Sequence, residues 1–307
     1  MATQNVLTKV AAIPRYIQNV IHSTRALESV AAASTSPEPR YETAAARTKF
    51  GPNSPPRNVS FSGSGFLAAF HLGVASMMIE KGYLTRESKF AGASGGALIA
   101  APLAADVSVE NIFKAMLEIS HDCRKDGTIW RAARVLRRVL SVALPEDAGQ
   151  RCTGRVTIAV TRVSPAPRQL VLENSFESRA DLVEALIASC FVPYYLERAF
   201  SLQWRQGLYI DGGIDDVLPP LPPGDVYATV CPVPPRWLNL AEQMVDIGPH
   251  LLRQELQAPM YRVIDQAIWP TDEKGLLALY ELGRLAASEW ACSLHPAMAS
   301  PSDCPTA

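Results

Sequence analysis

Three short glycine-rich turns hold the residues of this sequence that could carry out a reaction. Residues 62–65 are SGSG, residues 92–96 are GASGG and residues 211–213 are DGG. Glycine and serine are common in flexible turns, so each stretch has a simple explanation. The second also fits G-x-S-x-G, in which a serine stands on a sharp strand-to-helix turn and needs small neighbours. A hydroxyl, a carboxylate and a nest of backbone N–H groups are what acyl transfer requires.

The first turn has a second interpretation as a nucleotide site. Residues 63–68, GSGFLA, match the dinucleotide pattern G-x-G-x-x-G/A after an expected strand and at the start of an expected helix. That pattern also needs an acidic residue at the end of the second strand. Glu87 precedes the next expected strand instead of closing it. The sequence therefore favours an anion-binding turn over a dinucleotide site.

The base that would activate the serine can be a histidine or a carboxylate. In a hydrolase triad of the order Ser, Asp, His, only His250 and His295 follow Asp211. Both lie in an expected helical region, where a surface or helix-capping role is the simpler interpretation. A Ser–Asp dyad needs no histidine. Because aspartate has a low ordinary pKa, such a dyad works only in a dry, preorganised pocket.

Composition narrows the class of protein. The chain has 307 residues, 48% hydrophobic and 19% charged, with a formal net charge of −1, which fits a folded domain and gives no sign of nucleic-acid binding. Its six cysteines form no C-x-x-C pair, so metal-ligand spacing is absent and free thiols are favoured. The longest uncharged apolar run, around residues 95–105, is too short to span a bilayer. Any membrane contact should be peripheral.

Three regions follow one another along the chain. Residues 1–56 combine a basic start free of acidic residues with a Ser-, Ala- and Pro-rich stretch, which fits an organelle transit peptide and linker or a plain N-terminal extension. Residues 57–237 alternate expected strands and helices, which predicts an α/β domain with a largely parallel sheet. Residues 238–307 are expected to form a helical extension, continuous from about 238 to 294. The expected strands are 58–61, 90–91, 155–163, 208–210 and 225–231, and the expected helices include 66–81 and 181–190.

Taken together in this order, the turns resemble those of the patatin-like phospholipases, and within that family those of the adipose triglyceride lipase and adiponutrin group. The similarity covers residues 57–235. It includes VSFSGSGFL at 59–67, GASGGAL at 92–98, SCFVP at 189–193 and YIDGGI at 209–214. Ala68 departs from the third glycine of many relatives, and the long C-terminal region of the animal lipases is missing from this sequence.

The resemblance implies a three-layer patatin-like α/β sandwich and a set of site residues. These are Ser94 as nucleophile within an elbow bounded by Gly92 and Gly96, Asp211 as proton acceptor followed by Gly212 and Gly213, and an oxyanion hole from the backbone amides of Gly63, Ser64, Gly65 and Phe66. The expected activity is hydrolysis of glycerolipid acyl esters at a membrane or lipid-droplet surface, without metal or organic cofactor. Two alternatives stay open: a Ser-Asp-His hydrolase, and a catalytically silent lipid-binding or scaffold protein on the same fold.

One arginine-rich stretch invites a membrane role. Residues 130–140 carry four arginines interleaved with valine and leucine, as in helices that lie on anionic lipid. A helix that covers the core with a solvated outer face is the simpler interpretation. The expected location is intracellular, in the cytoplasm, on a lipid droplet or within a plastid or mitochondrion.

Overall fold

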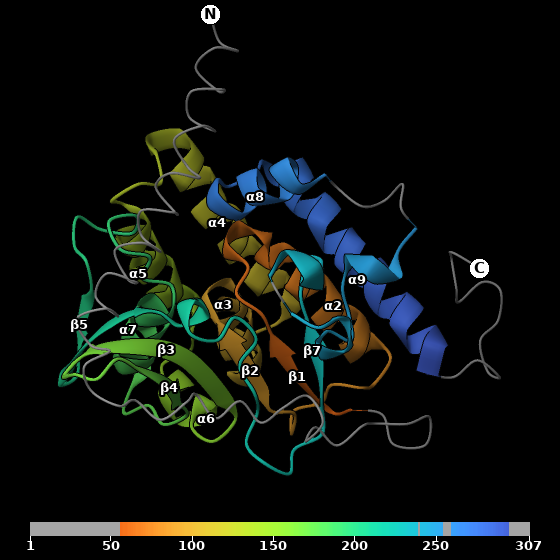
Figure 1. The fold of residues 1–307 in the computed structure, drawn as a ribbon, viewed down its shortest axis with the longest axis horizontal. Helices are drawn as coiled ribbons and strands as arrows, with labels where there is room; N and C mark the ends of the chain where they lie inside the picture. Colours follow the sequence, from red (N-terminus) through yellow and green to blue (C-terminus); the bar gives the residue numbers. More distant parts are fainter. Residues whose placement is uncertain (1–55, 239, 254–258, 295–307) are drawn as a thin grey trace, which may run out of the picture. The chain divides into compact units, whose positions relative to one another are not determined.

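The computed structural model describes residues 56–238, 240–253 and 259–294, all of which belong to one compact unit of the chain (Figure 1). Two sequence predictions lie outside these ranges. They are the N-terminal extension, apart from its last residue Pro56, and the environment of His295.

A seven-stranded sheet forms the centre of this unit, with the order β5-β6-β3-β2-β1-β7 and β4 paired to β3. The pairs β3–β2, β2–β1 and β1–β7 are parallel, whereas β4, β5 and β6 pair antiparallel. The strands are β1 (Asn58–Phe61), β2 (Phe90–Ala93), β3 (Val156–Ser164), β4 (Gln169–Glu173), β5 (Leu202–Trp204), β6 (Gly207–Asp211) and β7 (Tyr227–Val230). The sheet is therefore mixed, with a parallel centre of buried strands.

Strands β2 and β6 pair with the same edge of β3, one after the other along it. Ala159 pairs with Ala93 of β2 and Val160 pairs with Asp211 of β6, while both also pair with β4. Because β4 occupies one edge of β3, β2 and β6 must share the other edge. The turn after Ala93 and the carboxylate of Asp211 are thereby brought to the same place, although they are far apart in sequence.

Helices flank the sheet (Figure 1). The α-helices are α2 (Ala68–Glu80), α3 (Ala97–Ala104), α4 (Val109–Asp126), α5 (Ala132–Ala143), α6 (Ala148–Cys152), α7 (Arg179–Ser189), α8 (Met260–Ile268) and α9 (Glu273–Leu294). Short 3-10 turns are η2 (Gly65–Leu67), η3 (Ser94–Gly96), η4 (Gly212–Ile214), η5 (Pro235–Trp237), η6 (Glu242–Met244) and η7 (Pro249–Leu251).

Two glycines allow α9 to pack closely on α2. A Cβ atom at Gly73 would lie 1.9 Å from the Tyr280 carbonyl oxygen, and one at Gly283 would lie 2.1 Å from the Phe70 carbonyl oxygen. Both obstacles are backbone atoms, which cannot rotate away. Tyr280 and Arg284 of α9 also hydrogen-bond the Ser76 hydroxyl of α2. The C-terminal helix is therefore fixed directly to the helix that follows the first glycine-rich turn.

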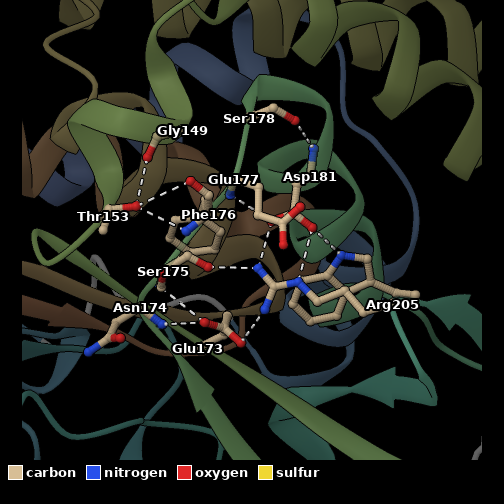
Figure 2. Close-up of polar contacts among 11 residues, drawn as sticks. Gly149, Thr153, Glu173, Asn174, Ser175, Phe176, Glu177, Ser178, Asp181 and Arg205 are labelled. Atoms are coloured by element: carbon tan, nitrogen blue, oxygen red, sulfur yellow. Dashed lines mark hydrogen bonds and ion pairs between the residues drawn. The ribbon is translucent and has the colours of Figure 1, made fainter.

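Arg205 fixes the start of α7, the helix that ends at the candidate site. Its guanidinium donates to Glu173 at the end of β4, to the Ser175 carbonyl and to Asp181 in the first turn of α7 (Figure 2). The Ser178 hydroxyl caps the same helix by accepting from the Asp181 N–H. These contacts join the β4 end, the α7 start and the β5–β6 turn.

Most element predictions within the parallel centre are confirmed, and one in the C-terminal part is wrong. Strand 58–61 is β1, and the helix expected at 66–81 is η2 followed by α2. Continuous helix from residue 238 is not observed, since residues 240–252 contain only short 3-10 turns and a bridge from Val230 to Ile247. Gly248, Pro249 and Pro259 interrupt helical hydrogen bonding there, and α8 starts only at Met260.

The arginine-rich stretch forms α5 and covers the core. Val135, Leu136, Val139 and Leu140 are buried, while Arg137 pairs with Glu184 and Glu197. Of the cysteines, Cys123, Cys152, Cys190 and Cys231 are buried free thiols, but Cys292 is disulfide-bonded, which corrects the expectation of free thiols at that position. None of the helices in the described ranges combines the length and apolar character that a membrane crossing needs.

Candidate active site

Ser94 stands at the turn from β2 into η3 and α3, with a positive φ of 50°. Such a backbone is strained for a residue other than glycine, and strain of this kind is concentrated at functional sites. Its neighbours must lack side chains. A Cβ atom at Gly92 would lie 2.6 Å from the Ala97 nitrogen, and one at Gly96 would lie 2.4 Å from the Phe61 carbonyl oxygen. The small residues around the serine are thus required by close backbone packing.

The SGSG turn lies directly against this elbow. A Cβ atom at Gly95 would lie 2.5 Å from both the Gly65 carbonyl oxygen and the Ser64 hydroxyl. Gly65 has a φ of +53°, and a Cβ there would lie 2.1 Å from the Ala267 carbonyl oxygen of α8. Gly65 therefore supplies both a left-handed turn and room for α8.

The amides of this turn differ in their availability, which corrects one sequence prediction. The Gly63 N–H donates to the Val217 carbonyl at 2.7 Å, so this amide is already used. The N–H groups of Ser64, Gly65 and Phe66 have no hydrogen-bond acceptor among the residues that the structure describes. The candidate oxyanion hole is thereby reduced to these three amides. The Ser64 hydroxyl is also buried without a partner in the described part of the chain.

His71 braces the same turn from α2. Its Nε2 lies 2.9 Å from the Ser62 carbonyl oxygen and, because a carbonyl only accepts, must carry the proton. Complete burial lowers the pKa of His71 to about 3, against a smaller opposing effect of the Ser62 hydrogen bond. The imidazole is therefore neutral at physiological pH and acts here as a hydrogen-bond donor to the turn.

Asp211 ends β6, is only 6% exposed, and faces the serine. Burial raises the pKa of its carboxyl to about 6, and hydrogen bonds from the Ser94 side chain and the Gly213 N–H act in the opposite direction. The Gly213 N–H donates to Oδ1 at 2.8 Å, and a Cβ at Gly212 would lie 2.0 Å from the Ala159 carbonyl oxygen. The two glycines thus let the chain pass β3 and hold the carboxylate.

Two residues at the end of α7 complete the site, and sequence analysis assigned them no role. The Ser189 hydroxyl accepts from the Ser94 N–H at 2.9 Å and donates to the Ala159 carbonyl at 2.8 Å. Cys190 is close enough for a side-chain hydrogen bond with Ser94 and for the charge of Asp211 to raise its pKa, after burial, which is the larger cause. The resembling stretch SCFVP at 189–193 was the signal that could have found them.

The other candidate bases lie elsewhere. His250 is exposed in η7, where partial burial lowers its pKa and the charges of Glu242 and Asp246 raise it. Asp215 forms an ion pair with Arg168 at 2.5 Å, and Asp216 accepts from the Leu218 N–H at 3.0 Å. Within the described ranges no three His, Cys, Asp or Glu residues group in a way that could hold a metal ion.

Comparison with known proteins identifies the family. The model of the patatin-like phospholipase family matches residues 59–222, which contain all three glycine-rich turns. This chain belongs to the patatin-like phospholipase family.

Relatives of known name differ in length and activity. Human patatin-like phospholipase domain-containing protein 4 is 29% identical over 239 residues, covering 74% of this chain and 92% of that protein. Mouse patatin-like phospholipase domain-containing protein 2 is 34% identical over 170 residues, covering 53% of this chain but 34% of that protein. Mouse 1-acylglycerol-3-phosphate O-acyltransferase Pnpla3 is 32% identical over 171 residues, covering 53% of this chain and 41% of that protein. The chain thus matches well under half the length of these last two relatives.

Among solved structures, the crystal structure of VipD from Legionella pneumophila is similar with a TM-score of 0.42 and 14% identity. That similarity covers 57% of this chain and 50% of the VipD chain.

Proposed function

We propose that this protein is a serine lipid acyl hydrolase that cleaves glycerolipid acyl esters through a Ser94–Asp211 dyad. The observation that carries the proposal is that β3 brings the Ser94 turn and the buried Asp211 carboxylate together, close enough for the Ser94 side chain to affect the pKa of that carboxyl. Family membership supports lipid acyl chemistry. The raised pKa of Asp211 supports a role as base, because proton transfer is most effective when the pKa is near the working pH.

The proposed reaction has two steps. The Ser94 oxygen attacks the ester carbonyl while its proton passes to Asp211, and the negative charge on the carbonyl oxygen is held by the amides of Ser64, Gly65 and Phe66. The leaving alcohol takes the proton from Asp211 and departs, which leaves an acyl-enzyme. Asp211 then removes a proton from water, which attacks the acyl group. Asp211 returns this proton to the Ser94 oxygen as the ester bond breaks, which releases the fatty acid and restores both residues.

Transfer of the acyl group to an alcohol is the second candidate. Relatives include proteins named as an acyltransferase and a transacylase. The same acyl-enzyme would serve, with an alcohol replacing water in the second step. We further propose that the substrate is reached by peripheral contact with a membrane or lipid droplet, in the cytoplasm or an organelle.

Labelling with a fluorophosphonate probe tests the nucleophile. The protein should be labelled, and Ser94→Ala should be unlabelled and inactive, since loss of a nucleophile costs on the order of 10⁶ in kcat. Labelling that persists in Ser94→Ala would place the nucleophile elsewhere. A folded protein that is neither labelled nor active would favour the silent lipid-binding alternative.

Histidine variants and a lipid panel complete the test. His250→Ala and His295→Ala should retain activity within a few-fold, whereas a loss of about 10³ in either would favour a triad. Incubation with triacyl-, phospho- and galactolipids, with and without a lysolipid acceptor, separates hydrolysis from acyl transfer by the product formed.

A further inference from the structure

Two exposed aromatic residues near the site have unusual backbones. Trp130 and Tyr194 are 48% and 52% exposed and have φ values of +63° and +59°. A positive φ is rare for bulky residues and energetically unfavourable, so the surrounding structure must enforce it. A strained backbone that holds a large aromatic side chain out in solvent indicates that this side chain has a function, such as binding a partner.

Hydrogen bonds join the two loops that carry these side chains. The Trp130 N–H donates to the Tyr195 carbonyl at 2.7 Å, and the indole Nε1–H donates to the Tyr194 carbonyl at 2.8 Å. The Arg198 guanidinium lies over the Trp130 ring at 4.3 Å, and Ile129 beside it is 42% exposed. We call Ile129, Trp130, Tyr194 and Arg198 the aromatic platform.

The platform is tied to the catalytic residues through one short segment. The Ser189 hydroxyl accepts from the Ser94 N–H at 2.9 Å, and the Phe191 carbonyl accepts from the Asp211 N–H at 2.9 Å. Tyr194 follows these residues in the same loop, and the Tyr195 N–H donates to the Val192 carbonyl. A surface that binds through Tyr194 would thus be held beside the site.

The charge around the platform is positive. Arg198 makes no ion pair with any residue in the described ranges, and the same holds for Lys125 and Arg134 in the adjoining ends of α4 and α5. The nearby carboxylates are already paired, Asp126 with Arg131 at 3.6 Å and Glu197 with Arg137 at 2.5 Å. Such a surface complements anionic head groups.

We propose that the aromatic platform docks this protein on an anionic phospholipid bilayer. Tryptophan and tyrosine favour the head-group level of a membrane, where their rings reach the acyl boundary. The Trp130 indole N–H is already bonded to the Tyr194 carbonyl, so its exposed ring is the part that would enter this level. Arg198 would meet lipid phosphates, and Ile129 would enter the acyl region. The inference rests on the proposed lipid acyl hydrolase, because docking here brings ester substrates to the loop that contacts Ser94.

Vesicle sedimentation of the full chain in a Ser94→Ala background tests the proposal without turnover. Binding to phosphatidylcholine vesicles containing phosphatidylserine should fall roughly tenfold in Trp130→Ala and in Tyr194→Ala. Arg198→Gln should weaken binding about fivefold to the anionic vesicles and little to pure phosphatidylcholine. Val142→Ser, at an apolar position 83% exposed in α5 and away from both loops, is the matched control and should bind like its parent.

Folding and function are checked separately. With Ser94 restored, each platform variant should hydrolyse a soluble short-chain ester within about twofold of the parent. Should Trp130→Ala fail to fold, Ile129→Ser and Arg198→Gln decide. Vesicle binding that is absent in the parent, or unchanged in the folded platform variants, would overturn the proposal and favour a protein partner for this surface. Normal vesicle binding without ester turnover in the Ser94 protein would overturn the proposed function instead.

Discussion

At the scale of single residues, Asp211 shows how burial makes a carboxylate a stronger base by raising its pKa. The carboxylate is hidden from water, accepts a hydrogen bond from the Gly213 N–H and lies close to the Ser94 side chain. Both contacts favour the charged form, yet burial has the larger effect and raises the pKa to about 6. A proton acceptor of that pKa is better suited to neutral pH than an ordinary aspartate.

Asp211→Asn should separate activity from stability. Because an amide cannot accept the serine proton, ester hydrolysis should fall by at least about 10²–10⁴-fold. Because the pKa of Asp211 is higher in the folded protein than in the unfolded chain, protonation of this carboxyl stabilises the fold. The stabilisation is fully present below about pH 4 and is lost as the pH rises to about 6. Removing the buried charge should therefore leave the fold equally stable or up to roughly 3 kcal/mol more stable at pH 7, as measured by urea denaturation.

The pH profile and a neighbouring carboxylate provide the controls. In the unmodified protein, kcat/KM should fall about tenfold per pH unit below about 6 and level off above it. Asp216→Asn should retain activity within a few-fold, since Asp216 accepts from the Leu218 N–H. Loss of turnover in Asp216→Asn but not in Asp211→Asn would reassign the base.

The residues that sequence analysis found are those with a local pattern. Ser94 and Asp211 stand in glycine-rich turns whose need for small neighbours is visible from the chain alone. The use of the Gly63 amide by Val217 and of the Ser94 amide by Ser189 was not visible, because each joins segments distant in sequence. His71 was missed as a brace of the turn for the same reason.

At the scale of elements, α7 links a surface ion network to the site. Arg205 and Ser178 hold its first turn, and the Ser189 hydroxyl at its end accepts the N–H of the nucleophile Ser94.

Arg205→Met should destabilise the protein by about 1–2 kcal/mol in urea denaturation, since three acceptors lose a partner but the guanidinium is partly exposed. Arg138→Met, at an exposed arginine paired with Glu118 and Asp122, should cost under about 0.5 kcal/mol in the same urea titration. Equal costs would mean that the Arg205 network contributes no more than a surface pair.

Element predictions succeeded where burial repeats in a simple pattern. The last three residues of β1 and the first six of β3 are buried without interruption, β3 is also rich in β-branched residues, and both strands appear as expected. The partly exposed β4 and the three-residue β5 carry little local signal, since β4 is defined by its pairing with β3 and β5 by its pairing with β6. Residues 240–252 were predicted as part of a continuous helical extension, but Gly248 and Pro249 favour turns there.

At the scale of the whole molecule, the packing of α9 bears on where the catalytic domain ends. The family match stops at residue 222, and a boundary at 237/238 stays a prediction. Yet α9 crosses α2 at Gly73 and Gly283 with backbone against backbone. Since α2 also carries His71, which is hydrogen-bonded to the first glycine-rich turn, the C-terminal helix supports that turn through α2.

Gly283→Ala tests whether α9 is a structural part of the catalytic domain. In an open helix this change stabilises by about 1 kcal/mol, because alanine is the better helix former. Here the added Cβ would lie 2.1 Å from the Phe70 carbonyl oxygen, so α2 and α9 must move apart. The variant should lose about 1–3 kcal/mol in urea denaturation, and its ester hydrolysis should fall with the displaced turn. Leu277→Ala, at a half-exposed position of α9, should cost less than about 0.5 kcal/mol. A Gly283→Ala variant that is more stable than its parent would mean that α9 does not press on α2, and residues 238–307 would then be an extension that the catalytic domain does not need.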